Sequence, residues 1–199
     1  MRAEITKKGS GKVKRCFWAE GKEDYYVKYH DKEWGRPVRN DKVHFEFMVL
    51  EGAQAGLSWS TILSRREAFR KAYSDFDVNK VAKYTPKKIE SMMKDESIIR
   101  NRLKITSSVS NAKLFIEIQK EFGSFNKYVW SFVGGKPIIN KRRSKKDYVA
   151  TSKESDGLSA DLKKRGFKFV GSTIMYSHMQ ACGLVNDHEV GCFCYKKLI

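Results

Sequence analysis

The sequence lacks the features that mark secreted, membrane-spanning or disulfide-linked proteins. No apolar run approaches the roughly 20 residues needed to cross a bilayer, and the amino terminus has no apolar stretch typical of a signal peptide. Only four cysteines occur in 199 residues. Disulfides are not expected in such a chain, so the cysteines point to a metal or to simple burial. We therefore expect a cytoplasmic protein with no membrane partner.

Prolines and strand patterns are also scarce. The chain has three prolines, no internal repeat and no sustained alternation of apolar and polar residues. Residues that can cap a helix, at Asp41, Ser58, Thr85 and Ser124, each precede apolar positions near helical spacing. Further helical patterns cover residues 97–121, 155–165 and 174–183. The sequence therefore predicts an all-α architecture, long enough for a single domain with a substantial core.

Acidic residues are too few to balance the basic ones: 40 Lys and Arg face 23 Asp and Glu, a formal net charge of +17. Part of the excess lies in residues 1–15, which we predict to be a flexible basic arm ahead of one domain over residues 16–199. A second basic cluster runs from Lys136 to Lys146. Neutralising phosphates releases counterions, so this charge favours binding to a polyanion. The alternative is that it serves solubility alone.

One acidic residue, Glu51, stands between two groups of aromatic residues. Tyr26, Tyr29 and Trp34 precede it, and Trp59 follows it. Aromatic faces attract flat cations, and a carboxylate adds negative charge and hydrogen-bond acceptors. On a strongly basic chain, this combination indicates a pocket for a planar, positively charged base carried on a polyanion, such as a damaged nucleobase in DNA. The alternative is an ordinary aromatic core with a solvated glutamate. In the pocket, we predict that Glu51 is ionised, with Tyr29 among its polar partners.

Two of the predicted helices are joined by a tight turn with glycine at both ends. The first helix ends at Gly166, and Gly171 precedes the second helix at Ser172 and Thr173. Free backbone amides and the positive end of the helix dipole can hold a phosphate there without reading base sequence. Lys168 adds positive charge at the tip. Because glycine ends many helices, the pattern gains its weight from the accompanying basic charge.

Four Cys and His residues lie near the two ends of the predicted domain. Cys16 and His30 are close to its start, and His188 and Cys192 are close to its end with three residues between them. Two thiolates and two imidazoles form the closed tetrahedral set typical of structural zinc. Cys194 could replace Cys192, and a chain without metal remains an alternative. Cys182 is expected in the core, and His44 and His178 are predicted to be ordinary helix residues.

Six blocks of the sequence resemble the bacterial 3-methyladenine DNA glycosylase I family. The blocks are Cys16–Trp18, Tyr29–Gly35, Leu50–Trp59, Trp130–Val133, Leu162–Gly171 and Gln180–His188. The resemblance extends from about Cys16 to Tyr195, and residues 136–151 match it poorly. It implies the helix-hairpin-helix DNA glycosylase fold, with one structural Zn²⁺ that joins the termini. On this basis the zinc ligands are expected to be Cys16, His30, His188 and Cys192.

The resemblance also implies the residues that contact DNA. The base pocket is expected to consist of Trp18, Tyr26, Tyr29, Trp34, Glu51 and Trp59. A wedge that enters the duplex is expected at Gln54, Gly56 and Leu57. The hairpin that holds the backbone is expected over residues 166–173, with Gly166, Lys168, Gly171, Ser172 and Thr173 as its contacts.

The activity implied by the resemblance is excision of 3-methyladenine from alkylated double-stranded DNA by hydrolysis of the N-glycosidic bond. The expected products are an abasic site and free 3-methyladenine, released by a monomer without lyase activity. Other helix-hairpin-helix glycosylases have a catalytic Asp after the hairpin, whereas Asp187 lies among the expected zinc ligands. A cationic base already leaves as a neutral molecule, so strong general-base catalysis is not required. The sequence leaves two alternatives for Glu51: a part in the chemical step, or recognition of the base alone. The alternative function is a non-catalytic module that binds nucleic acid or free alkylated bases.

Overall fold

The computed structural model describes residues 13–199, so most of the predicted basic arm lies outside the described residues. Within residues 13–15, the chain already contacts the folded domain. The Arg15 guanidinium forms an ion pair with Asp31 at 2.8 Å, and the Lys14 carbonyl accepts a hydrogen bond from the Phe193 amide at 3.0 Å. Among the described residues, no helix is both long and apolar enough to span a bilayer.

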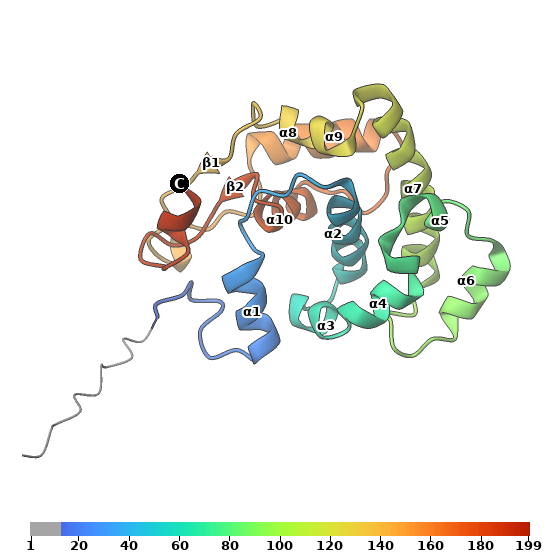
Figure 1. Ribbon diagram of the computed structural model, residues 1–199, viewed down its shortest axis with the longest axis horizontal. Coiled ribbons are helices and arrows are strands. Elements are labelled where there is room, and N and C mark those ends of the chain that lie inside the picture. The colour runs from blue at the N-terminus through green and yellow to red at the C-terminus, as the bar shows by residue number, and fades with distance from the viewer. Residues whose placement is uncertain (1–12) are drawn as a thin grey trace, which may run out of the picture.

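The described chain is mostly helical (Figure 1). The α-helices are α1 (Asp24–Lys32), α2 (Asp41–Gln54), α3 (Trp59–Ser64), α4 (Arg66–Ala72), α5 (Val78–Val81), α6 (Pro86–Met93), α7 (Arg102–Phe122), α8 (Phe125–Ser131), α9 (Lys153–Lys164) and α10 (Ser172–Ala181). Short 3-10 helices are η1 (Ser74–Phe76), η2 (Lys145–Asp147) and η3 (Tyr195–Leu198). The caps predicted at Ser58, Thr85 and Ser124 are confirmed, because each side chain accepts a backbone N–H of its helix.

Two predicted boundaries are wrong. Asn40, not Asp41, caps α2 with its side chain. The Asp41 carboxylate instead accepts the Phe125 and Asn126 amides at 2.9 and 2.8 Å and so holds the start of α8. The long helix α7 starts after Asn101 rather than at residue 97. The first difference arises because neighbouring Asn and Asp residues have similar cap propensities. In the second, the Asn101 side chain caps α7 by accepting the Lys104 amide.

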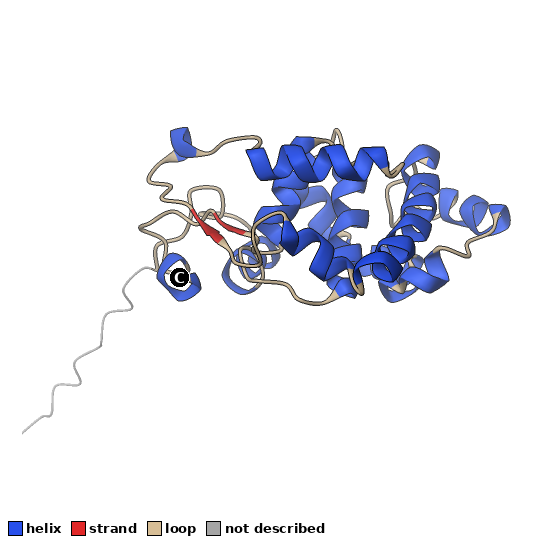
Figure 2. Cartoon of the chain, turned by 90° about the horizontal axis from the view of Figure 1, so that it is seen from above, coloured by secondary structure: helices blue, strands red, loops and turns tan. Residues whose placement is uncertain are grey.

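The prediction of an all-α chain misses a small parallel sheet. Strand β1 (Ile138–Ile139) pairs with β2 (Val185–Asn186), and an isolated bridge joins Arg142 to Glu189. Figure 2 shows the two strands at the end of the molecule where the C-terminus lies. A strand of two residues is too short for apolar alternation to show in the sequence.

Helix α2 forms the centre of the helical part. It packs against α3, α7, α8 and α10, and nearly every residue from His44 to Glu51 is buried. A helix in this position is surrounded by other elements on most of its sides. Around it, Phe115 of α7 and Phe125 of α8 stack with ring centroids 3.9 Å apart. The helix therefore carries Glu51 inside the protein rather than on its surface.

Helices α9 and α10 form an antiparallel hairpin whose turn is fixed by the neighbouring helix α7. The Asn111 side chain donates to the Lys168 carbonyl at 2.8 Å and accepts the Lys168 amide at 3.0 Å. The Ser159 hydroxyl donates to the Val170 carbonyl at 2.7 Å. The turn includes Gly166 at φ +93° and Phe169 at φ +57°, and the side-chain bonds hold this uncommon backbone conformation in place.

The end of α10 docks on the segment that follows α1. The Gln180 and Cys182 carbonyls accept the amides of Gly35 and Val38, each at 2.9 Å. A Cβ atom at Gly183 would lie 2.3 Å from the Arg36 carbonyl carbon, and Gly183 has φ +69°. Only glycine permits this approach. The contact brings α1 and α10 to opposite sides of one cavity.

Candidate functional site

A cavity of about 210 Å³ lies between α1, α2, α3 and α10. Its walls are Trp18, Tyr26, Tyr29, Trp34, Glu51, Gln54, Trp59, Tyr148, Ser177, Gln180 and Ala181. All six side chains predicted for a base pocket therefore line this one cavity, and so does Gln54 of the predicted wedge. Tyr148 and the α10 residues were not expected from the sequence. The cavity is narrow and aromatic on several sides, which suits a flat ring.

The aromatic walls are braced from behind. The Trp59 ring stacks at 22° on Phe47, and its centroid lies 5.6 Å from that of Tyr29. On the other side, the Trp18 ring stands edge-on to Trp34 with centroids 4.8 Å apart. Such edge and offset contacts fix ring orientation. The walls are thus largely in place before a ligand enters.

Glu51 is 3% exposed. Only one of its two carboxyl oxygens has a hydrogen-bond partner in the described chain. Its Oε2 lies 2.9 Å from Nδ1 of His178, whereas Oε1 is buried with no hydrogen-bond partner among residues 13–199. Burial raises the pKa of Glu51 well above its usual value, so the protein environment alone favours the neutral acid. This argues against the predicted ionised state without a cationic ligand, because an opposite charge is needed to restore it.

The predicted Tyr29 partner is also replaced. The polar contact of Glu51 in the described chain is to His178, and Tyr29 lies near Glu51 without a hydrogen bond to it. The pKa of Tyr29 is raised well above its usual value by burial and, secondarily, by the charge of Glu51. The prediction of His178 and His44 as ordinary helix residues is wrong. His178 precedes Cys182 by four residues, as His188 precedes Cys192, and this spacing could have drawn attention to it.

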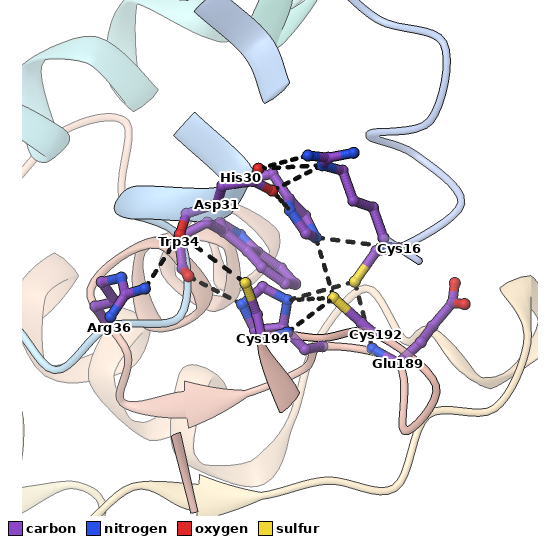
Figure 3. A network of polar contacts seen from close by, with 10 residues as sticks. Cys16, His30, Asp31, Trp34, Arg36, Glu189, Cys192 and Cys194 are labelled. Atoms are coloured by element: carbon purple, nitrogen blue, oxygen red, sulfur yellow. Dashed lines mark hydrogen bonds and ion pairs between the residues drawn. The ribbon is translucent and has the colours of Figure 1, made fainter. Parts of the chain in front are cut away.

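The four predicted metal ligands come together in a separate cluster beside the cavity. Cys16, His30, His188 and Cys192 are all buried, and their ligand atoms lie within 4.8 Å of one another. The Cys192 sulfur is 3.5 Å from His30 Nε2 and 3.6 Å from His188 Nδ1. Figure 3 shows Cys16, His30 and Cys192 converging from the two terminal segments. The Cys194 sulfur instead approaches the Asp31 carbonyl at 3.9 Å and lies outside this set of four, in a second group with His30 and Asp31.

Hydrogen bonds around the cluster orient its donors. The outer nitrogen of His188, Nε2, lies 3.0 Å from the Trp34 carbonyl, and that of His30, Nδ1, lies 2.8 Å from an Asp31 oxygen. The opposite ring nitrogens therefore face the sulfurs. The Glu189 amide donates to the Cys16 sulfur at 3.4 Å. Contacts with Cys16 and Cys194 lower the pKa of the Cys192 thiol, which favours the thiolate.

The cluster and the cavity share walls. The Trp34 ring stands edge-on to His188 with centroids 4.7 Å apart, and the Trp18 ring stands edge-on to His30 at 5.0 Å. Gly35 has φ +76°, and a Cβ atom there would lie 3.0 Å from the His188 ring. The Trp34-Gly35 pair thus allows one imidazole to pack closely behind the cavity.

Asp187 is fully buried and accepts hydrogen bonds from the Arg142 and Tyr176 side chains in a structural network.

The predicted wedge forms a turn after α2, next to the start of α10. Leu57 is 42% exposed, and Gly56 has φ +78°. A second cavity of about 130 Å³ separates this turn from Thr173 and Ser177. The Lys104 ammonium donates to the Ala53 and Ala55 carbonyls at 2.8 and 2.6 Å. Lysine therefore satisfies the last carbonyls of α2 and leaves Leu57 presented at the surface.

Not every predicted backbone donor in the hairpin is free. The amides of Gly166, Phe167 and Lys168 donate to Lys163, Leu162 and Asn111, respectively. By contrast, the amides from Phe169 to Thr173 have no acceptor in the described part of the chain. The donors available for a phosphate are therefore confined to the second half of the turn and the first turn of α10.

Comparisons with known proteins show the family to which the chain belongs. The family model for methyladenine glycosylases matches residues 18–195, so the chain belongs to the methyladenine glycosylase family. It is 45% identical to DNA-3-methyladenine glycosylase 1 of Escherichia coli (strain K12) over 183 residues, covering 92% of this chain and 97% of that protein. It is 43% identical to DNA-3-methyladenine glycosylase of Haemophilus influenzae, covering 90% of this chain and 97% of that one.

Solved structures give the same relationship. A crystal structure of 3-methyladenine DNA glycosylase I has a TM-score of 0.88 at 45% identity, covering 92% of this chain and all of that one. The Staphylococcus aureus 3-methyladenine DNA glycosylase I, whose structure addresses 3-methyladenine recognition, has a TM-score of 0.88 at 36% identity, covering 93% and 98%. A variant of 3-methyladenine DNA glycosylase I solved in complex with 3-methyladenine has a TM-score of 0.85 at 36% identity, covering 87% and 94%.

Proposed function

We propose that this protein is a DNA repair glycosylase that flips 3-methyladenine out of alkylated double-stranded DNA and hydrolyses its N-glycosidic bond. It leaves an abasic site, has no lyase activity and works as a monomer. One observation carries the proposal: the buried carboxyl group of Glu51 lines an aromatic cavity of about 210 Å³, and its Oε1 has no hydrogen-bond partner among the described residues. Such a pocket favours a flat cation that carries a hydrogen-bond donor.

The chemical step requires little from the protein beyond binding of the base and electrostatic stabilisation. A 3-methylated adenine is cationic while attached to the sugar, so it departs as a neutral base without a proton donor. When the cation enters, its charge lowers the pKa of Glu51, and the acid releases its proton to solvent to form the carboxylate. Glu51 then recognises the base edge and lies close to the cationic ring, while Trp59 and Tyr29 frame the ring. The proposal gives Glu51 its role through electrostatics rather than nucleophilic attack.

DNA is held by two separate elements. The helix-hairpin-helix formed by α9 and α10 binds the backbone through the amides from Phe169 to Thr173, with Lys168 adding charge. Gly56 and Leu57 enter the gap left by the flipped nucleotide, and Gln54 lies between this wedge and the base pocket. Leu57 supplies apolar surface that offsets part of the unstacking cost. The hairpin anchors any sequence, whereas the pocket selects the damaged base.

Zinc fits the Cys16, His30, His188 and Cys192 cluster. Two thiols and two imidazoles are the donors zinc prefers, and each outer imidazole nitrogen already has an oxygen partner. A bound Zn²⁺ supplies a crosslink between the terminal segments and leaves no open position for catalysis. The aromatic contacts at Trp34 and Trp18 then pass this rigidity to the pocket.

Release of bases from methylated DNA tests the proposed function directly. The full chain is incubated with duplex DNA treated with a methylating agent, and the free bases are separated by chromatography. We expect 3-methyladenine in the supernatant and abasic sites in the DNA. Binding of free 3-methyladenine without any release from DNA would instead identify a non-catalytic module.

Glu51→Gln should weaken excision of 3-methyladenine by about 10- to 100-fold, because it replaces a hydrogen bond to a charged group by a neutral one. The side chains have nearly the same shape, so packing is kept. Single-turnover excision measured beside metal content provides the check. Metal content should not change, and an unaltered excision rate would exclude a role for the carboxylate charge.

A further inference from the structure

Three buried side chains form a hydrogen-bonded row behind the pocket. His178 Nδ1 lies 2.9 Å from Glu51 Oε2, and His178 Nε2 lies 3.1 Å from His44 Nδ1. Relative exposure is 3% for Glu51, 1% for His178 and zero for His44. His44 and Glu51 are two turns apart on one face of α2, and His178 of α10 bridges them. The proposed reaction does not yet use either imidazole.

The row can accommodate Glu51 in either protonation state. Burial lowers the pKa of His178 to about 4 and that of His44 to about 3, so both imidazoles are neutral at pH 7. A neutral imidazole has one donor nitrogen and one acceptor nitrogen. His178 Nδ1 can therefore accept a hydrogen bond from the Glu51 acid or donate one to its carboxylate, and His178 Nε2 takes the opposite role toward His44. No heavy atom has to move between the two arrangements.

We propose that His178, held in place by His44, is a positioning residue that commits one carboxyl oxygen of Glu51 and thereby presents the other to the alkylated base. The proposal rests on the proposed glycosylase function. It follows from the division of the carboxyl group: Oε2 meets His178, and Oε1 has no partner among the described side chains. Without His178, neither oxygen has a fixed partner and the carboxyl plane can rotate, which lowers the fraction of productive geometry.

Two substitutions separate this role from simple packing. In His178→Asn, the amide lies where Nδ1 was and can still meet Glu51, whereas in His178→Gln the amide reaches the Nε2 position and meets His44. We expect His178→Asn to keep 3-methyladenine affinity within about threefold and His178→Gln to lose about tenfold, the worth of a hydrogen bond to a charged group. A packing role predicts the reverse order, because Asn leaves the larger cavity.

The measurements are quenching of tryptophan fluorescence by free 3-methyladenine and its excision from methylated DNA, with thermal melting to confirm folding. Equal losses in both variants, or a larger loss in His178→Asn, would overturn the proposal. If the unmodified protein excises 3-methyladenine but the order is reversed, only this proposal fails. If the unmodified protein releases no base, the proposed function fails first.

Two further measurements keep the test independent of variant folding. In the unmodified protein, the ¹⁵N shift of His178 Nδ1 should change when a cationic N-alkylated purine nucleoside binds, because the positive charge converts its partner Glu51 from acid to carboxylate; an unresponsive shift contradicts the proposal. His44, His178 and Cys182 also lie close enough to hold a cation. A fall in metal content in His178→Asn would therefore overturn the positioning role, whereas an unchanged content supports it.

Discussion

Trp59 illustrates how single side chains set the affinity of the pocket. Its ring lines the cavity and is backed by Phe47, so it offers a fixed face to an incoming base. Stacking on an aromatic side chain contributes about 1–3 kcal/mol per base. Trp59→Ala should therefore weaken 3-methyladenine binding by one to two orders of magnitude in a competition or calorimetric assay. Trp59→Phe keeps a flat face and should lose less; equal losses would show that Trp59 only fills the core.

Tyr148 is a second residue with a testable role. It lines the cavity, and its buried hydroxyl makes no hydrogen bond within the described chain, although burial and, secondarily, the nearby Cys16 thiol raise the pKa of Tyr148. A free donor in a binding pocket gains a partner when the ligand arrives. We expect Tyr148→Phe to weaken 3-methyladenine binding by about two- to tenfold and to leave the melting temperature unchanged or higher. Unchanged affinity would mean that the hydroxyl does not meet the base.

Residue types in the pocket could be predicted from the sequence, but their partners could not. Aromatic residues around one acid indicate a cation-binding pocket wherever the chain brings them together. The polar contact of Glu51 depends on α10 crossing α2, which places His178 beside a residue more than a hundred positions earlier. Tyr148 was not predicted as a pocket residue, because its neighbouring residues form no recognisable motif.

At the scale of elements, the local sequence predicted where helices begin better than it predicted which distant segments they contact. Ser58, Thr85 and Ser124 cap their helices because the cap needs only a side-chain oxygen and the next turn of backbone. Asp41 shows the limit: it satisfies the amides at the start of α8, which are 84 and 85 residues away. The β1–β2 pair likewise depends on a long-range meeting of two short segments.

The turn after α2 gives a prediction about an element rather than a contact. If it is a wedge, Leu57→Ala should lose more affinity for duplex with an abasic site than for intact duplex, because only the former has a gap for the side chain. Fluorescence anisotropy with the two duplexes at one salt concentration measures this difference. Ile199→Ala, at an exposed position near the C-terminus, serves as a matched control. Equal losses on both duplexes would assign Leu57 to packing.

At the scale of the whole molecule, the terminal segments are closed against each other. Cys16 and His30 come from one end of the described chain, and His188 and Cys192 come from the other. The sequence predicted this set of four from ligand chemistry and from the family resemblance, while spacing alone left Cys192 and Cys194 as alternatives. In the structure, Cys192 lies in the set of four, and the Cys194 sulfur lies against the Asp31 carbonyl.

If zinc crosslinks the terminal segments, its removal should lower stability before it affects base binding. One zinc should copurify per chain, and Cys16→Ala should lose it and lower the melting temperature, because metal binding to a site formed only in the folded state stabilises that state. Loss of 3-methyladenine binding should follow only at temperatures near the new transition, since the imidazoles pack behind Trp18 and Trp34 and do not line the pocket themselves. Cys194→Ala is the matched control and should keep the metal. Elemental analysis of freshly purified, chelator-free protein, read beside melting curves, decides the matter: absence of metal, or equal destabilisation by both substitutions, contradicts a zinc crosslink.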